Sequence, residues 1–141
     1  MQKRIEHIQK INDAWMQSEL CAPASESEIA EFEKKMQIVI PESYKAFLRI
    51  SNGATLFGGD CILFSVSPEE TRRINYDFSG GNVPEALLIV GAYNSAHICY
   101  DARYDSFFFY EYEGYAHIKE ECAEFSDFYE VLDYMIEIAE N

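Results

Sequence analysis

The sequence has few positive charges. Its 11 Lys and Arg residues stand against 25 Asp and Glu residues, and the formal net charge is −14. Residues 104–141 hold one base, Lys119, and 11 acids, a net charge of −10. Because phosphate binding needs clustered Lys and Arg, we expect no nucleic-acid partner. Long-range attraction to a basic protein partner is one interpretation of this charge, and a charge that serves only solubility is the other.

Long apolar runs are also missing. No stretch approaches the roughly 18 apolar residues of a membrane-spanning helix, so we expect no membrane partner. The N-terminus, MQKRIEHIQKIN, has no apolar segment of the secretory kind. The four cysteines, Cys21, Cys61, Cys99 and Cys122, are far apart and form no CxxC pair, which favours buried thiols in a cytoplasmic protein. The length of 141 residues predicts one domain over residues 1–141.

The sequence motifs of common catalytic sites are absent. There is no Walker loop, GxGxxG, HExxH or GxSxG. His97 and Cys99 lie on the same face of a predicted strand and could supply two metal ligands, but a zinc site needs three or four, and a packed strand face is the alternative. We therefore predict a protein that is not an enzyme, with no catalytic residue, no cofactor and no metal.

The first quarter of the chain predicts two helices. The spacing of Ile5, Ile8 and Trp15 predicts an apolar stripe on a helix over residues 2–17. Ser25 begins an S-x-x-E capping box, which predicts the start of a second helix. The expected buried stripe of that helix is Ile29, Phe32 and Met36.

A third helix is predicted in IPESYKAFLRISNG, residues 40–53. Pro41 suits the first helical position, with Ile40 as the cap before it. Val39 and Tyr44 are spaced to form a hydrophobic staple across that start. The Asn-Gly pair at 52–53 follows a helical pattern, so we interpret it as the helix stop, with Gly53 at positive φ.

From residue 55 the pattern becomes that of strands, and a last helix follows. A short helical turn is predicted over 67–75, and residues 115–118 are a candidate further strand. The last helix is predicted to begin near Ser126. The main strands are expected at 55–57, 61–66, 86–93, 96–101 and 106–114. The order predicts an α+β fold, with N-terminal helices and a C-terminal helix packed on one mostly antiparallel sheet of about five strands.

Several of these positions together resemble the SUKH superfamily, bacterial immunity proteins related to the fungal regulators of cell-wall glucan synthesis. The resemblance begins with I-x-x-F-E, continues with P-x-x-Y-x-x-F-L and ends with NG. It extends through residues 87–101 and 124–132, although the turn at 92–95 lacks the acidic and glycine residues common in the family. The matching positions are Ile29, Phe32, Glu33, Pro41, Tyr44, Phe47, Leu48, Asn52 and Gly53.

The resemblance implies a binding protein. Bacterial members commonly neutralise polymorphic toxins, often nucleases or deaminases, by tight stoichiometric binding, and neither this role nor the alternative needs catalysis. The expected partner is then a basic toxin domain. The alternative is a regulatory or scaffold module in cell-wall synthesis or signalling.

The C-terminal third is the predicted partner-binding region. The run FFFYEYEGY, residues 107–115, would offer Tyr-rich contact area beside carboxylates if its Tyr face is exposed. Carboxylates on the last helix would imitate phosphates in the cleft of a nuclease. The alternatives are Tyr rings that simply flank a sheet and an ordinary solvated helix face. The candidate residues are Tyr110, Glu111, Tyr112, Glu113, Glu120, Glu121, Asp127, Glu130, Asp133 and Glu137.

Overall fold

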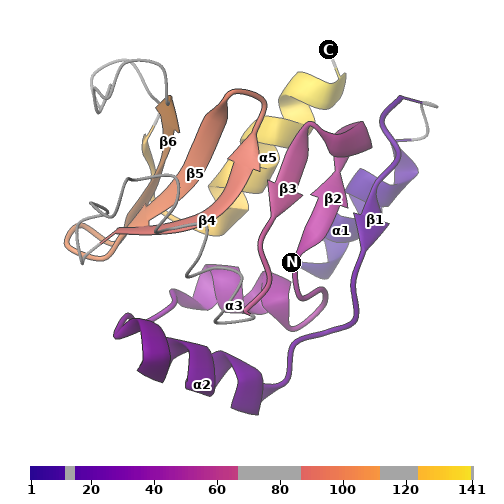
Figure 1. Ribbon diagram of the computed structural model, residues 1–141. Coiled ribbons are helices and arrows are strands. Elements are labelled where there is room, and N and C mark those ends of the chain that lie inside the picture. Colours follow the sequence, from indigo (N-terminus) through magenta and orange to yellow (C-terminus); the bar gives the residue numbers. More distant parts are fainter. Residues whose placement is uncertain (12–14, 67–86, 112–123, 141) are drawn as a thin grey trace.

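The computed structural model describes residues 1–11, 15–66, 87–111 and 124–140 (Figure 1). Within these residues the α-helices precede and follow the main strands, as the sequence predicts, and one two-residue strand lies between the first two helices. A short 3-10 turn, η1, spans Phe57–Gly59. The α-helices are α1 (Gln2–Lys10), α2 (Glu26–Met36), α3 (Glu42–Leu48) and α5 (Phe128–Glu140).

The described strands form one antiparallel sheet in which each strand pairs with the next along the chain. The α+β class is confirmed, but the sheet has seven described strands where about five are expected. The two additional strands, β1 and β7, have two residues each, too few to show an alternating pattern. The strands are β1 (Glu19–Leu20), β2 (Ala54–Leu56), β3 (Cys61–Leu63), β4 (Leu87–Tyr93), β5 (Ala96–Asp101), β6 (Ser106–Glu111) and β7 (Glu124–Phe125).

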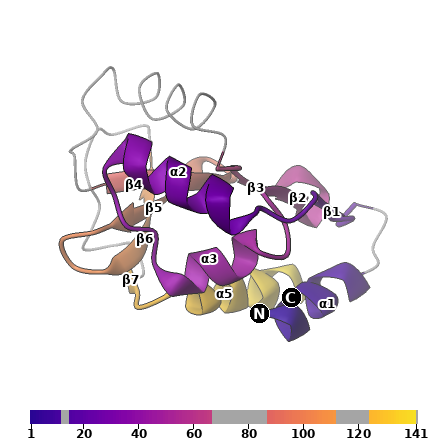
Figure 2. The ribbon, with the colours of Figure 1, turned by 90° about the horizontal axis from the view of Figure 1, so that it is seen from below.

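Helices α1, α3 and α5 lie along one face of the sheet, and α2 lies beyond the ends of the strands (Figures 1 and 2). The ring of Phe128, at the start of α5, is central to this layer. Its centroid lies 4.8 Å from that of Tyr44, 5.7 Å from Phe47 and 5.6 Å from Phe107. These contacts join α3, α5 and β6 in one aromatic core, where such ring pairs add to the gain from apolar burial.

Helix α1 is shorter than predicted. It ends at Lys10, and Trp15 is 85% exposed, so the expected stripe stops after the buried Ile5 and Ile8. Tertiary hydrogen bonds hold the following segment against the turn after β2. The Gln17 carbonyl accepts from the Gly58 N–H at 2.8 Å, and β1 pairs with β2 just beyond. Local spacing cannot anticipate such bonds.

Helix α2 begins as its capping box predicts. The Ser25 Oγ accepts from the Glu28 N–H at 3.1 Å, and the Glu28 carboxylate accepts from the Ser25 N–H at 3.0 Å. Ile29 and Phe32 are buried, as expected, whereas Met36 is only half-buried. The buried stripe of α2 is therefore shorter than predicted by one position.

The predicted start of α3 is wrong in two respects. Pro41 is the cap and not the first helical residue, because its backbone is extended and its carbonyl accepts the N–H groups of Tyr44 and Lys45 at 3.0 Å. Val39 is 73% exposed and so forms no staple with Tyr44. Glu33 holds this start of the helix in place of the staple, since its Oε2 accepts the Ile40 N–H at 2.8 Å.

The Asn-Gly pair lies further from the helix than predicted. Helix α3 ends at Leu48, and the turn that follows is closed by the Ser51 N–H on the Phe47 carbonyl at 2.9 Å. Gly53 has φ +89°, which confirms the positive φ, but it turns the chain into β2 instead of capping the helix. Asn52 contributes its Oδ1, which accepts the Val66 N–H at 2.8 Å.

The remaining elements follow the predictions in their main features. The hairpin of β2 and β3 turns through Gly58–Asp60, β4 and β5 lie where expected, and α5 begins two residues after Ser126. Phe107 and Phe109 of β6 join the core under the helices, whereas Phe108 packs on the other face of the sheet with Ile89. The helical turn predicted at 67–75 and the strand predicted at 115–118 lie outside the described residues.

Candidate partner-binding surface

The predicted contact residues divide between the end of β6 and α5. The backbone of Tyr110 and Glu111 belongs to β6 and pairs with His97 and Ala96 of β5. Tyr112, Glu113, Glu120 and Glu121 lie outside the described residues. The described part of the predicted surface is therefore mainly the acidic side of α5.

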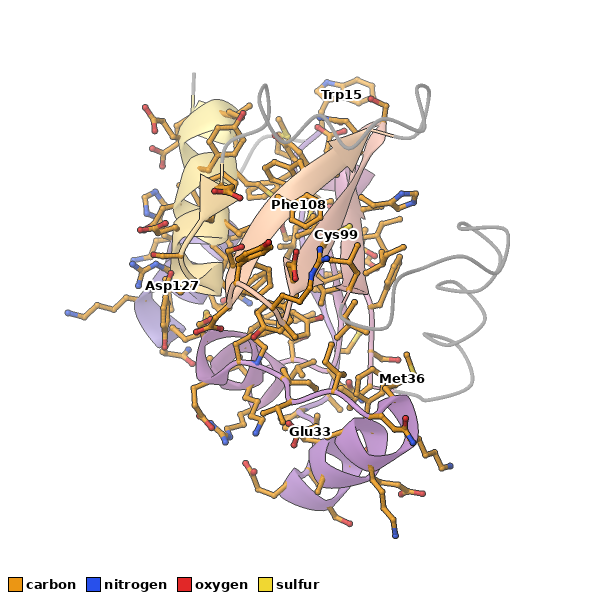
Figure 3. All side chains as sticks on the ribbon, turned by 90° about the vertical axis from the view of Figure 1, so that its left-hand side faces the viewer. Trp15, Glu33, Met36, Cys99, Phe108 and Asp127 are labelled. Atoms are coloured by element: carbon orange, nitrogen blue, oxygen red, sulfur yellow. The ribbon has the colours of Figure 1, made fainter. Side chains whose placement is uncertain are left out.

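The first two carboxylates of that helix take part in its own start. Asp127 precedes α5 (Figure 3), and its Oδ1 accepts the Glu130 N–H at 2.9 Å. The Glu130 carboxylate accepts the Ser126 N–H at 2.9 Å. These bonds satisfy amide groups that a helix start leaves without partners. Asp127 and Glu130 thus have a structural role that the charge pattern alone does not reveal.

Asp133 pairs with the N-terminal helix. The Arg4 Nε lies 2.8 Å from the Asp133 Oδ1, and the Arg4 Nη2 lies 3.0 Å from Oδ2, which makes the pair bidentate. This hydrogen bonding raises the pKa of Arg4. The guanidinium also lies 4.8 Å from the ring centroid of Tyr129. Helix α1 therefore supplies positive charge to the acidic side of α5.

Glu137 lies in a shallow recess of about 290 Å³ between α1 and α5. Lys3 and Arg4 line the recess from α1, and His7 is hydrogen-bonded to Glu140. Glu137 forms no ion pair within the described residues. Lys3, His7 and Lys10, with Arg4 beside them, recur at three- or four-residue spacing along α1. This spacing indicates a basic side of the helix, but it does not indicate that α5 is the partner.

His97 and Cys99 are packed side chains on the sheet face opposite the helices. They are 7% and 4% exposed, and Cys99 packs beside Phe108 (Figure 3). Burial lowers the pKa of His97 and raises the pKa of Cys99 to about 12. A thiol with such a pKa is protonated at neutral pH and is a poor nucleophile or ligand. Among the described residues no group of three or more His, Cys, Asp or Glu is placed to hold a metal.

The residues of the motif are parts of the scaffold. Ile29, Phe32, Phe47 and Leu48 are buried. The Tyr44 hydroxyl, also buried, donates to the Phe64 carbonyl at 2.9 Å and lies 3.4 Å from the Val90 carbonyl. The motif thus identifies how α3 is attached to β4 and to the residue that follows β3, and it leaves the partner surface to other residues.

No helix in the described ranges is long and apolar enough to cross a membrane. The fold and its surface define an α+β domain in which a motif of buried residues joins two helices to an antiparallel sheet. The model of the SMI1 / KNR4 family (SUKH-1) matches residues 23–131, and the chain belongs to this family. A search of the curated proteins finds no match. The family match leaves α1 and the last turns of α5 outside its span.

Proposed function

We propose that this protein is an immunity protein that neutralises a cognate nuclease- or deaminase-type toxin by stoichiometric binding. Membership in the SUKH-1 family is compatible with immunity and regulatory roles, and neither needs catalysis. The observation that favours immunity is the acidic excess of residues 104–141, with a net charge of −10. A toxin that acts on nucleic acid must present Lys and Arg to phosphates, and carboxylates can occupy the same site.

The acidic side of α5 is the described surface that best fits this role. Glu130, Asp133, Glu137 and Glu140 recur along the helix, and Lys3 and Arg4 of α1 offset only part of their charge. Glu137 is exposed and lacks an ion pair within the described residues, so its carboxylate is the one most available to a basic partner. A partner cation there would add a contact without breaking one of the protein's own ion pairs.

The direct test begins with the genes beside this one: where one of them encodes a toxin-like protein, the two products are co-expressed. We expect a one-to-one complex on size-exclusion chromatography and survival of cells that express the toxin. The affinity should fall as salt increases, because exposed charges separated by more than about 10 Å are screened at 0.1 M salt. Absence of a complex together with absence of protection would refute the proposal.

A charge reversal at Glu137 tests the surface separately. Glu137→Lys should weaken the complex on the order of tenfold, or about 1.4 kcal/mol. The control is Glu31→Lys on the exposed side of α2, which makes the same charge change away from α5. It also removes the exposed ion pair of Glu31 with Lys35 at 3.5 Å, and such a pair contributes little to stability. Equal losses in the two variants would show that only net charge matters and that α5 is not the contact.

A regulatory or scaffold module in cell-wall synthesis or signalling is the second candidate, because the same family match supports it equally. The two candidates differ in genomic setting: a toxin gene beside this one favours immunity. In its absence, affinity purification under native conditions should recover envelope-synthesis or signalling proteins if the module is regulatory.

A further inference from the structure

A groove of about 490 Å³ opens between the link from α2 to α3 and the turn from β5 to β6. In Figure 1 this turn lies above the C-terminal end of α2, and Figure 3 views the molecule from this side. Residues 37–41 form one wall, and Ala102 and Asp105 lie on the other, with Tyr100 between them. The elements around this groove are separate from the acidic side of α5.

On the first wall, the aliphatic side chain of Val39 is exposed to solvent. Ile38 and Ile40 are buried on either side of Val39, and the Ile40 N–H is held by the Glu33 carboxylate. The backbone between these anchors has little freedom, so the exposure of Val39 follows from the fold. An exposed aliphatic residue on an anchored segment offers apolar contact at little cost in chain entropy.

The second wall holds the carboxylate of Asp105. The Asp105 Oδ1 accepts the Tyr100 hydroxyl at 2.8 Å, and Asp105 forms no ion pair within the described residues. The nearby Arg103 is engaged elsewhere, because its guanidinium binds Asp101 through two contacts of 3.0 and 2.9 Å. A carboxylate has about four acceptor positions, so the bond from Tyr100 leaves room for a second donor.

The other charges around the groove largely offset one another. The Lys45 ammonium lies 3.3 Å from the Glu33 carboxylate and 3.8 Å from that of Glu42. Glu42 also pairs with Arg49 at 3.1 Å. Arg49 also pairs with Glu26 at 2.6 Å, outside the groove. Of the charged residues that line the groove, Glu42 and Lys45 offset each other, and the remaining negative charge is that of Asp105.

We propose that this groove receives an arginine side chain of a basic protein partner, with the guanidinium on Asp105 and the aliphatic stem against Val39 and Ala102. Arginine fits better than lysine because its planar fork matches a carboxylate and its stem can cover apolar surface. This inference rests on the proposed function and deepens it. It gives the toxin a second point of contact apart from α5.

A small probe tests the groove without a toxin. The probe is N-acetyl-arginine amide, titrated into the full-length, isotope-labelled protein and followed by amide NMR shifts. We expect saturable shifts at Val39, Ala102 and Asp105. Asp105→Asn should weaken binding on the order of tenfold, because it removes the charge and keeps an acceptor for Tyr100. The same change at Asp60, an exposed residue at the turn before β3, is the control and should have no effect.

Shifts that centre on another surface, or that persist unchanged in Asp105→Asn, would overturn the proposal. N-acetyl-lysine amide should bind more weakly than the arginine probe, and equal binding would contradict the role of the guanidinium fork. Retention of the wild-type unfolding midpoint by Asp105→Asn shows that a loss of binding is local.

Binding to the neighbouring toxin separates this inference from the proposed function. If wild type binds the toxin and Asp105→Asn binds it equally well, the groove inference fails while the immunity proposal stands. If wild type fails to bind the toxin but the arginine probe still binds at Asp105, the immunity proposal fails and the groove is supported. Weakened toxin binding by Asp105→Asn, with unchanged binding by Asp60→Asn, supports both.

Discussion

Single polar side chains, in the motif and beside it, join one element of the fold to another. The Glu33 carboxylate extends from α2, accepts the Ile40 N–H and pairs with the Lys45 ammonium. On α3, the Ser43 hydroxyl oxygen accepts the Phe128 N–H, at the start of α5, at 2.9 Å. Both bonds satisfy amide groups that would otherwise be costly to bury. The sequence pattern identified Glu33 only as a matching position. The hydrogen bond of Glu33 to Ile40 and its ion pair with Lys45 are visible only in the folded structure.

Tyr44→Phe should lower the free energy of unfolding by about 1–3 kcal/mol, since it leaves the part-buried Phe64 carbonyl without its hydroxyl donor. Urea unfolding followed by circular dichroism measures this loss. Tyr134→Phe is the control, because the Tyr134 ring packs against Phe109 and Phe125, its hydroxyl forms no hydrogen bond within the described residues, and the residue is 38% exposed. A loss at Tyr44 no larger than at Tyr134 would contradict the importance of the bond.

Gly53→Val should destabilise the protein through two separate effects. A residue with a side chain at φ +89° is strained by roughly 1–2 kcal/mol. An added Cβ would also lie 2.9 Å from the Leu63 carbonyl oxygen and 3.1 Å from the Ser65 nitrogen. Denaturant unfolding of Gly53→Val and Gly59→Val measures the two effects.

Gly59 is the matched control, because its φ is also positive, at +103°, but an added Cβ has no neighbour within 4 Å. Gly53→Val should therefore lose more stability than Gly59→Val. Equal losses would refute the backbone clash, and an unchanged midpoint in Gly53→Val would refute the positive φ.

At the scale of elements, α1 is attached to the fold by apolar burial more than by charge. Ile5→Ala should cost about 2–5 kcal/mol, because the side chain is 1% exposed and its removal leaves a cavity. Arg4→Ala should cost no more than about 1 kcal/mol, since its pair with Asp133 is partly exposed. Thermal and urea unfolding of both variants compare the two, and a larger loss in Arg4→Ala would reverse this interpretation.

The elements also show which local patterns predict structure. The capping box at Ser25 predicted the start of α2 because both of its partners lie within one helical turn. The expected roles of Trp15 and Val39 failed because hydrogen bonds to other elements fix the backbone beside them. The strands β1 and β7 could not be predicted, since two residues show no period and their pairing partners lie far away in the sequence.

At the scale of the whole molecule, the net charge of −14 should oppose folding through self-repulsion. Raising NaCl from about 0.01 M to about 0.1 M shortens the screening length from about 30 Å to about 10 Å. We expect the melting temperature to rise over this range. Replacing Asp60 and Glu137 by their amides should reduce the rise. A melting temperature that falls with salt would mean that the native ion pairs outweigh the repulsion.

The α+β class, the motif of the family and the excess of acid in the last third can all be recognised in the amino-acid sequence alone. Each depends on local spacing or on composition, which neighbours along the chain decide. The pairing of α1 with the acidic side of α5 is visible only in the tertiary structure. The same is true of the hydrogen bonds by which Asp127 and Glu130 cap the start of α5. The tertiary structure also placed Val39 and Asp105 on opposite walls of one groove. These are relations between segments many residues apart, and they arise when the sheet and its helices pack together.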